Sequence, residues 1–151
     1  MSRKEKLRIL LDTSFILPTL GIDVGDDVLS GLTKLKSCSC DIFVSRFSIL
    51  ESLWIAIRLK KKGKFNEKRF MLGMRSILRG GKYVIVEENP RVFEKALKMY
   101  FLGHHDIIDN ILYGIADEYN MLLLTVDEEL RNFIQKEKMR DVLLFPAEIR
   151  F

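Results

Sequence analysis

Short apolar runs alternate along the chain with longer segments in which apolar residues recur every three or four positions. The runs have the length of strands and lie at residues 8–11, 42–44, 83–86, 121–125 and 142–145. The longer segments have helical spacing or helix-capping residues at their ends, and lie at residues 26–36, 45–63, 66–78, 90–101, 106–119 and 127–136. Strands that alternate with helices predict the α/β class, with a central, mainly parallel sheet covered by helices.

No repeat, low-complexity tract or linker divides the chain, and 151 residues are enough for one hydrophobic core. We therefore expect a single domain over residues 1–151. The longest apolar runs are far too short to span a bilayer. Asp12 interrupts the apolar stretch after the basic N-terminus, so this segment does not fit a signal peptide. These features favour a cytoplasmic protein with no membrane partner.

The net charge of +4 is unevenly distributed. Residues 58–82 contain ten Lys or Arg and a single acid, whereas residues 83–151 contain eight basic residues and thirteen acids. A basic segment beside an acidic remainder favours a polyanion as a partner. For the basic segment taken alone, a solvated helix end and turn is the simpler interpretation.

Several acids lie where a parallel sheet binds its ligands, at the carboxyl ends of the strands. Asp12 directly follows the first strand, Asp127 follows the fourth, and Asp106 and Asp109 open the helix before the fourth. Glu51 lies inside a predicted helix among apolar residues. Carboxylates that converge repel one another unless a cation neutralises them, and hard oxygen ligands suit Mg²⁺ or Mn²⁺.

The acidic motifs "LLDTSFILP", "FSILESLW", "HHDIIDN" and "LTVDEEL", in this order and spacing, resemble those of the PIN-domain ribonucleases. They are particularly similar to the VapC-type toxins of toxin–antitoxin pairs, and the resemblance covers nearly the whole chain. It implies a three-layer α/β/α PIN-like fold. It also implies an endoribonuclease that hydrolyses phosphodiester bonds in single-stranded or structured RNA with Mg²⁺ or Mn²⁺.

The resemblance implies a catalytic and metal-binding role for four acids: Asp12, Glu51, Asp109 and Asp127. Asp109 is preferred because it lies eighteen residues before Asp127, the spacing of the family. Asp106 lies three positions earlier on the same helical face and remains a candidate metal ligand. The third motif departs from the family pattern. The family usually has small residues after this acid, whereas this chain has Asn110, Tyr113 and Gly114 in those places.

Other residues would support these acids or bind the substrate. The hydroxyl side chains beside two of the acids would position them by hydrogen bonds: Thr13, Ser14 and Thr125. Basic side chains would hold the RNA backbone electrostatically: Arg58, Lys60, Lys61, Lys62 and Lys64. By analogy with VapC-type toxins, we expect a homodimer and an antitoxin protein as partners. Because the segment at residues 58–82 makes the chain longer than a minimal member of the family, a free-standing PIN nuclease with no antitoxin remains an alternative.

Helix capping explains each aspartate taken alone, because Asp is a common N-cap residue. Capping does not explain Glu51, so the joint metal site is favoured. An aspartate-nucleophile phosphatase would need a second acid at Ser14, and in a receiver domain the phosphorylated acid would follow the third strand, where this chain has Glu87. The more serious alternative is a catalytically silent PIN-fold module that binds RNA or docks a protein.

The expectations for the histidines, the aromatic residues and the cysteines are weaker. His104 and His105 are expected in a surface loop, with at most a substrate contact. Trp54 is expected in the core, and Phe65 is expected to be exposed and available to stack on a base. The two cysteines are one residue apart, a poor geometry for a disulfide, and are expected to be free thiols: Cys38 and Cys40.

Overall fold

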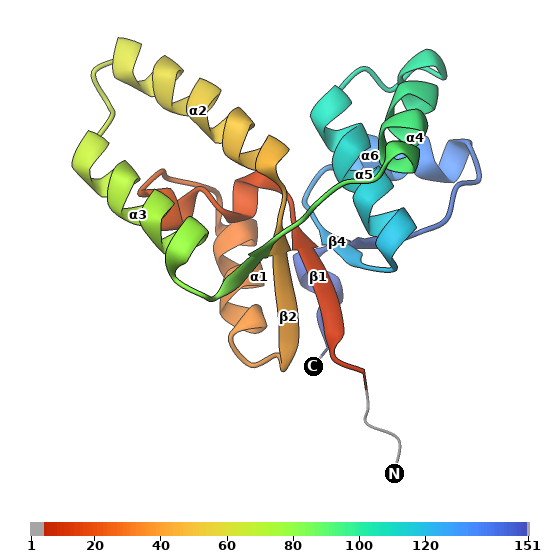
Figure 1. The fold of residues 1–151 in the computed structure, drawn as a ribbon, viewed down its shortest axis with the longest axis horizontal. Coiled ribbons are helices and arrows are strands. Elements are labelled where there is room, and N and C mark those ends of the chain that lie inside the picture. The colour runs from red at the N-terminus through yellow and green to blue at the C-terminus, as the bar shows by residue number, and fades with distance from the viewer. Residues whose placement is uncertain (1–4, 151) are drawn as a thin grey trace.

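A computed structural model describes residues 5–150 and contains one five-stranded sheet (Figure 1). The strands lie near their predicted bounds: β1 (Leu7–Leu11), β2 (Cys40–Val44), β3 (Tyr83–Ile85), β4 (Leu122–Leu124) and β5 (Leu143–Leu144). All neighbouring strands are parallel, and their order is β3-β2-β1-β4-β5. The α/β fold with a parallel sheet is confirmed.

Six α-helices connect the strands within residues 5–150: α1 (Asp26–Leu35), α2 (Arg46–Lys61), α3 (Glu67–Arg79), α4 (Pro90–Phe101), α5 (Ile107–Tyr119) and α6 (Glu128–Lys136). Between β1 and α1 the chain forms two 3-10 turns, η1 (Thr13–Phe15) and η2 (Pro18–Leu20). A third turn, η3 (Pro146–Glu148), follows β5. Residues 1–4, which carry part of the basic N-terminus, lie outside the described residues.

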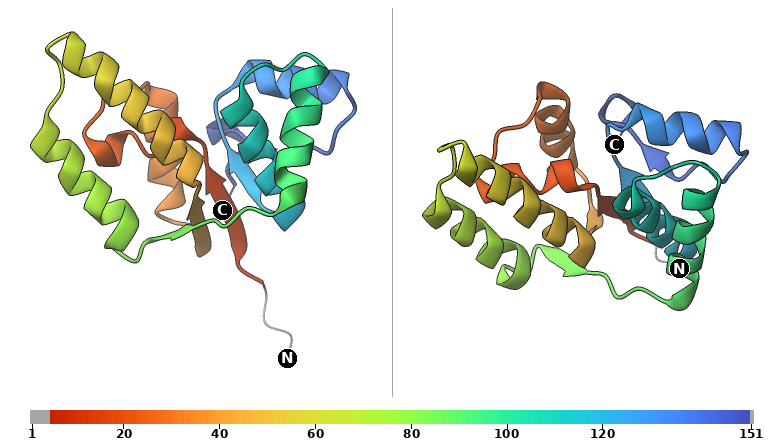
Figure 2. Two further views of the ribbon diagram at one scale, coloured as in Figure 1. Left: turned by 45° about the horizontal axis from the view of Figure 1, so that its top comes forward. Right: turned by 90° about the horizontal axis from the view of Figure 1, so that it is seen from above.

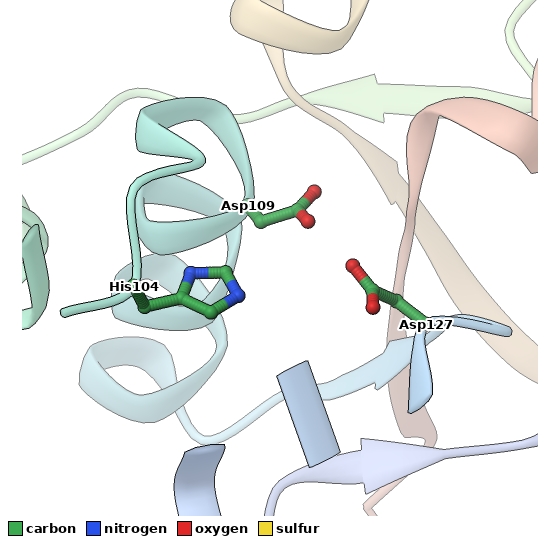
Figure 3. A group of neighbouring side chains, drawn as sticks. All are labelled: His104, Asp109 and Asp127. Carbon is green, nitrogen blue, oxygen red and sulfur yellow. The ribbon is translucent and has the colours of Figure 1, made fainter. Parts of the chain in front are cut away.

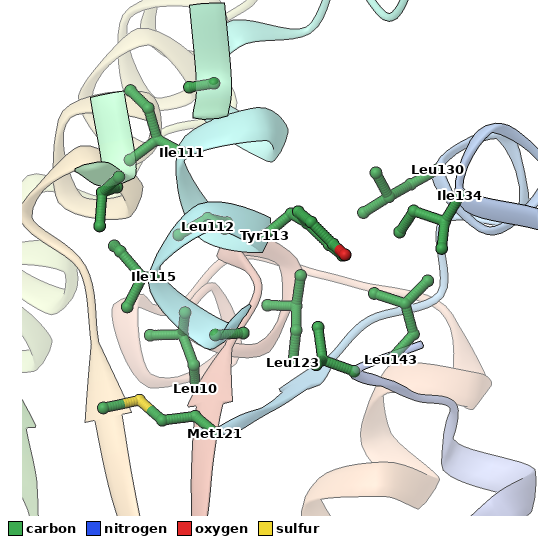
Figure 4. Packing of buried hydrophobic residues seen from close by; sticks show 14 of the residues in the cluster. Leu10, Ile111, Leu112, Tyr113, Ile115, Met121, Leu123, Leu130, Ile134 and Leu143 are labelled. Atoms are coloured by element: carbon green, nitrogen blue, oxygen red, sulfur yellow. The ribbon is translucent and has the colours of Figure 1, made fainter. Parts of the chain in front are cut away.

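The sheet separates two hydrophobic cores because successive strand side chains point to opposite faces. Leu10, Leu123 and Leu143 face the core that α4, α5 and α6 cover (Figure 4). Their strand neighbours, such as Leu11 and Leu124, face the second core, which contains residues of α1, α2 and α3. Figure 2 shows the two groups of helices on either side of the strands, which is the expected three-layer α/β/α arrangement.

The two central strands define the position of the candidate site. β1 and β4 pair in register, with Leu11 opposite Leu124, and the Asp12 N–H donates to Leu124 O at 3.0 Å. From β1 the chain continues toward β2, and from β4 it continues toward β5, so the connections diverge at this pair. Such a topological switch point is the usual ligand site of a doubly wound parallel sheet.

Two sequence expectations about the fold are wrong. Cys38 and Cys40 are joined by a disulfide, because the turn between α1 and β2 brings their Cα atoms to 5.3 Å, a normal spacing for such a bond. Trp54 is 48% exposed, because it lies on the face of α2 that points away from the sheet. Among the described helices, none combines the length and the apolar character needed to cross a membrane.

Candidate metal centre

Asp12 lies at the carboxyl end of β1 and is only 8% exposed. Its Oδ1 accepts a hydrogen bond from the Thr13 N–H at 2.6 Å and so caps η1, as helix capping predicts. Its Oδ2 accepts from the Thr125 hydroxyl at 2.7 Å. Burial raises the pKa of Asp12 to about 6, although both hydrogen bonds oppose that shift. The carboxylate is therefore desolvated and held on both oxygens.

Thr125 links the acids that follow the two central strands. Its hydroxyl donates to Asp12 and accepts from the Asp127 N–H at 3.1 Å. Asp127 in turn caps α6, because its Oδ1 accepts from the Leu130 N–H at 3.1 Å. The second Asp127 oxygen makes no cap hydrogen bond and is left for other contacts.

Asp106 and Asp109 occupy different positions at the start of α5. Asp106 is exposed and caps the helix, since its Oδ1 accepts from the Asp109 N–H at 3.1 Å. Asp109 is 8% exposed and points toward Asp127 (Figure 3). The geometry favours Asp109 as the inner acid of the site and places Asp106 at its rim.

Asp109 and Asp127 lie close enough to shift each other's pKa in opposite directions. Burial, a hydrogen bond to Asp127 and the negative charge of Asp12 raise the pKa of Asp109 far above the usual carboxyl range. Burial acts to raise the pKa of Asp127 as well, but the hydrogen bond with Asp109, together with backbone N–H groups at the start of α6, lowers it overall. Such paired carboxyl groups are typical of sites that bind a cation or transfer protons.

Glu51 reaches the same acids from α2, whose first turn is capped by the Ser45 hydroxyl. Its side chain is half-buried, and burial raises its pKa, as does the nearby Asp106 carboxylate. Thr13 and Arg58 act in the opposite direction. The Glu51 carboxylate also lies close enough to Asp12 to raise the pKa of Asp12.

His104 was not expected in the site and lies inside it. It is 4% exposed, its ring packs against Phe133, and its Nδ1 lies 2.6 Å from Asn110 Oδ1. One ligand atom each of His104, Asp109 and Asp127 lies within 4.8 Å of the other two (Figure 3). The expectation of a surface position is wrong for His104 and agrees with the structure only for His105, which is exposed.

The burial of His104 follows from the turn after α4. Gly103 has a φ of 115°, a conformation that favours glycine, and the His104 N–H then bonds Met99 O at 3.1 Å. The sequence contained one relevant signal, a glycine directly before the histidine and four residues before the first residue of the helix that carries Asp109. That signal alone does not distinguish a buried ring from an exposed one.

The remaining predicted residues surround this centre at different distances. The Thr13 hydroxyl is buried and makes no hydrogen bond of normal geometry within residues 5–150, but it lies close enough to Glu51 to lower its pKa. Ser14 is half-buried. The predicted RNA-binding side chains are all exposed, on the last turns of α2 and the loop after it: Arg58, Lys60, Lys61, Lys62 and Lys64. Phe65, expected to be exposed, is half-buried and packs edge-on against Phe70.

The donor set fits a divalent cation. Metal–oxygen bonds of about 2.1 Å place neighbouring ligand atoms about 3 Å apart and opposite ones about 4 Å apart. The ligand atoms of His104, Asp109 and Asp127 already lie within 4.8 Å of one another, so only a small contraction is needed. A cation would also neutralise carboxylates that burial and mutual repulsion disfavour in their charged form.

No family model matches the sequence, and no curated protein matches it either. The structure, in contrast, matches chains of solved toxin–antitoxin complexes over nearly their whole length, so the chain has the fold of these proteins. A toxin–antitoxin complex from Klebsiella pneumoniae matches with a TM-score of 0.56 and 14% identity, over 93% of this chain and 99% of the other.

Two further structures give the same result. The VapBC2 complex from Rickettsia felis, bound to a DNA fragment from its promoter, matches with a TM-score of 0.59 and 13% identity, over 91% of this chain and 98% of the other. FitAcB from Neisseria gonorrhoeae matches with a TM-score of 0.55 and 16% identity, over 92% of this chain and 98% of the other. The three-layer α/β/α, PIN-like fold that the resemblance implied is confirmed.

Proposed function

We propose that this protein is a metal-dependent endoribonuclease that hydrolyses phosphodiester bonds of RNA, and that it acts as the toxin of a toxin–antitoxin pair. The supporting observation is the convergence of acids from four separate segments at the switch point of the sheet: Asp12, Glu51, Asp109 and Asp127. Helix capping accounts for single aspartates but does not require these segments to meet.

The proposed ligands of a Mg²⁺ or Mn²⁺ ion are these four acids, with Asp106 at the rim. A bound divalent cation would supply positive charge at the phosphate and lower the pKa of a water molecule. The protein would contribute the positions of the carboxylates: Thr125 and the Thr13 N–H hold Asp12, and the cap of α6 orients Asp127. Fixed, desolvated carboxylates cost little reorganisation during the reaction.

The proposed RNA path runs from these acids along α2. Arg58 lies near enough to Glu51 to lower its pKa, and the exposed lysines continue beyond it into the loop before α3. Lysine and arginine side chains in such a row attract the phosphate backbone without reading its sequence. These side chains would position the RNA, and the metal site formed by the acids would cleave it.

The proposed antitoxin would cover the apolar groove between α2 and α3. This groove has a volume of about 490 Å³ and is lined by Leu53, Ile57, Phe70 and Met71, with two lysines at its edge. Exposed apolar surface of this kind is typical of sites that bind another protein. The matched structures from Klebsiella and Rickettsia are themselves described as complexes of this type.

The direct test is cleavage of a mixed-sequence RNA by the purified protein with Mn²⁺, compared with the variants Asp109→Asn and Asp12→Asn. Each variant keeps the side-chain shape and removes a charge from the site. We expect each to lower the cleavage rate by about a hundredfold or more, because losing a ligand disturbs both the cation and the bound water. Asp23→Asn, at an exposed aspartate of the loop before α1, is the matched control and should cleave normally.

Two results would contradict the proposal. If the two site variants cleave as fast as the parent protein, the activity does not come from these acids. If the parent protein binds RNA but never cleaves it with Mn²⁺ or Mg²⁺, the catalytically silent module is the better description.

A further inference from the structure

The buried imidazole of His104 has one ring nitrogen without a protein partner. Nδ1 contacts Asn110, whereas Nε2 forms no hydrogen bond within residues 5–150. Figure 3 shows the ring turned so that Nε2 lies on the side of Asp109 and Asp127. The side chain is only 4% exposed, and a cation between the ring and the two acids would give Nε2 a partner.

The contacts of Asn110 determine which nitrogen carries the proton. The Asn110 side chain is fully buried, and its Nδ2 donates to two carbonyls, His104 O at 2.7 Å and Ala96 O at 3.3 Å. The opposite orientation would turn the amide oxygen toward both carbonyls, which is unfavourable. Oδ1 therefore faces Nδ1, and Nδ1 must be the donor. In the neutral ring this leaves a lone pair on Nε2, directed at the acids.

We propose that His104 is a nitrogen ligand of the metal centre, that Asn110 holds it in the ligating tautomer, and that the site consequently prefers Mn²⁺ to Mg²⁺. Imidazole suits first-row transition ions, whereas Mg²⁺ is bound by oxygen ligands and retained water. A buried partner on the second ring nitrogen is the usual device that orients a ligating histidine. The inference rests on the proposed function only in assuming that a divalent cation binds at these acids.

A different role for the same ring is a charged imidazolium that neutralises Asp109 and Asp127 and never contacts the cation. Both roles place the ring beside the acids, but they differ in a directly measurable property. A ligating nitrogen is bonded to the metal and couples magnetically to it. A counter-ion is displaced or remains at a distance when the metal binds.

The test is pulsed electron paramagnetic resonance of the unmodified protein loaded with one equivalent of Mn²⁺, read for the coupling of a ¹⁴N nucleus to the ion. We expect a directly bonded nitrogen in the parent protein and in His105→Gln, since His105 is exposed and is the matched control. His104→Gln should lose the nitrogen signal while keeping bound Mn²⁺. Asp109→Asn should weaken Mn²⁺ binding, which ties the signal to this centre.

Calorimetric titration with each ion alone provides the second measurement. His104→Gln should weaken Mn²⁺ binding by about tenfold or more and Mg²⁺ binding by less than about threefold, so that the preference for Mn²⁺ disappears. The inference is overturned if the parent protein binds Mn²⁺ without nitrogen coupling or does not bind Mn²⁺. It is also overturned if His104→Gln weakens the binding of Mn²⁺ and of Mg²⁺ by the same factor. Nitrogen-coupled Mn²⁺ in a protein that fails to cleave RNA would support the metal ligand and contradict the proposed function.

Discussion

At the level of single residues, the aspartates of the site serve the local backbone and the site at once. Asp12 caps η1 with one oxygen and accepts from Thr125 with the other, and Asp127 caps α6 with one oxygen only. An N-cap carboxylate is held rigidly by the helix that it starts. The capping contacts therefore position the same side chains that we propose as metal ligands.

The raised pKa of Asp12 predicts how stability changes with pH in the metal-free protein. Because the folded protein binds this proton more tightly than the unfolded chain, with a pKa of about 6 against the usual 3.8, the contribution favours folding below about pH 4. It is lost as the pH rises through 6, at a cost of up to about 3 kcal/mol. With chelator present, Asp12→Asn should exceed the parent protein in free energy of unfolding at pH 7.5 and match it at pH 4.

Urea unfolding at the two pH values measures this difference, with Asp23→Asn as the control that should shift stability by less than about 0.5 kcal/mol at both. Mn²⁺ should stabilise the parent protein at pH 7.5 and have little effect on Asp12→Asn, because a ligand that binds only the folded state adds to its stability. An Asp12→Asn variant that is less stable than the parent protein at pH 7.5 without metal would contradict this account.

The acids could be predicted from the sequence at residue level, but the histidine could not. Asp12 and Asp127 each follow an apolar run predicted as a strand of a parallel sheet, so both were expected at the same edge of that sheet. The burial of His104 depends on the turn at Gly103, on Phe133 of α6 and on Asn110. Gly103 and Asn110 lie near His104 in the sequence, but Phe133 lies on a distant helix, so the local pattern alone does not determine whether the ring is buried.

At the level of elements, α2 combines an acid of the site with a basic end. Glu51 lies in its first half and the exposed basic residues lie at its end. Ten residues of helix separate Glu51 from Lys61, which is about 15 Å at a rise of 1.5 Å per residue. The helix therefore connects the acid centre with a basic end about two to three nucleotides away.

The end of α2 should contribute affinity for RNA and leave the chemistry unchanged. Replacing Lys60, Lys61, Lys62 and Lys64 by Gln should weaken RNA binding by about tenfold or more at low salt and flatten its dependence on salt concentration. The cleavage rate at saturating RNA should change by less than about threefold. As a control, glutamine at the exposed Lys136 and Lys138, near the end of α6, should leave binding nearly unchanged. A large loss of the saturated rate with unchanged affinity would contradict the proposed path.

The bounds of the helices and strands could be predicted well from the sequence, whereas the solvent exposure of the helix faces could not. Asn66 and Asp106, at which two of the predicted helical segments begin, cap α3 and α5, because each side chain accepts from a backbone N–H three residues later. Trp54 was misplaced because the outer face of α2 is as apolar as a core face. A single sequence does not show whether such a face is covered by the same chain or by a partner.

At the level of the whole molecule, two apolar faces lie outside the cores of the described chain. One is the groove between α2 and α3, and the other is a stripe along α4: Phe93, Leu97, Tyr100 and Phe101, which are 41% to 75% exposed. Their spacing places all four on one side of the helix. Since we propose an antitoxin for the groove, we propose a second copy of this chain for the stripe.

Leu97→Lys should therefore convert a dimer into a monomer in size-exclusion chromatography with light scattering. A lysine at the centre of the stripe would carry an unpaired charge into the interface, which typically costs at least tenfold in affinity. Lys98→Glu, at an exposed position of α4 beside the stripe and outside it, is the control and should remain dimeric. A parent protein that is monomeric at high concentration, or a Leu97→Lys variant that stays dimeric, would show that this stripe is not the interface.

The central claim is that acids from four distant segments form a single metal site at the carboxyl ends of β1 and β4. Anomalous diffraction from crystals soaked in Mn²⁺ tests it most directly, because the signal locates the ion without reference to any assumed role. We predict an anomalous peak bounded by Asp12, Glu51, Asp109 and Asp127. A peak elsewhere in the protein, or none at a Mn²⁺ concentration that supports RNA cleavage, would contradict the claim.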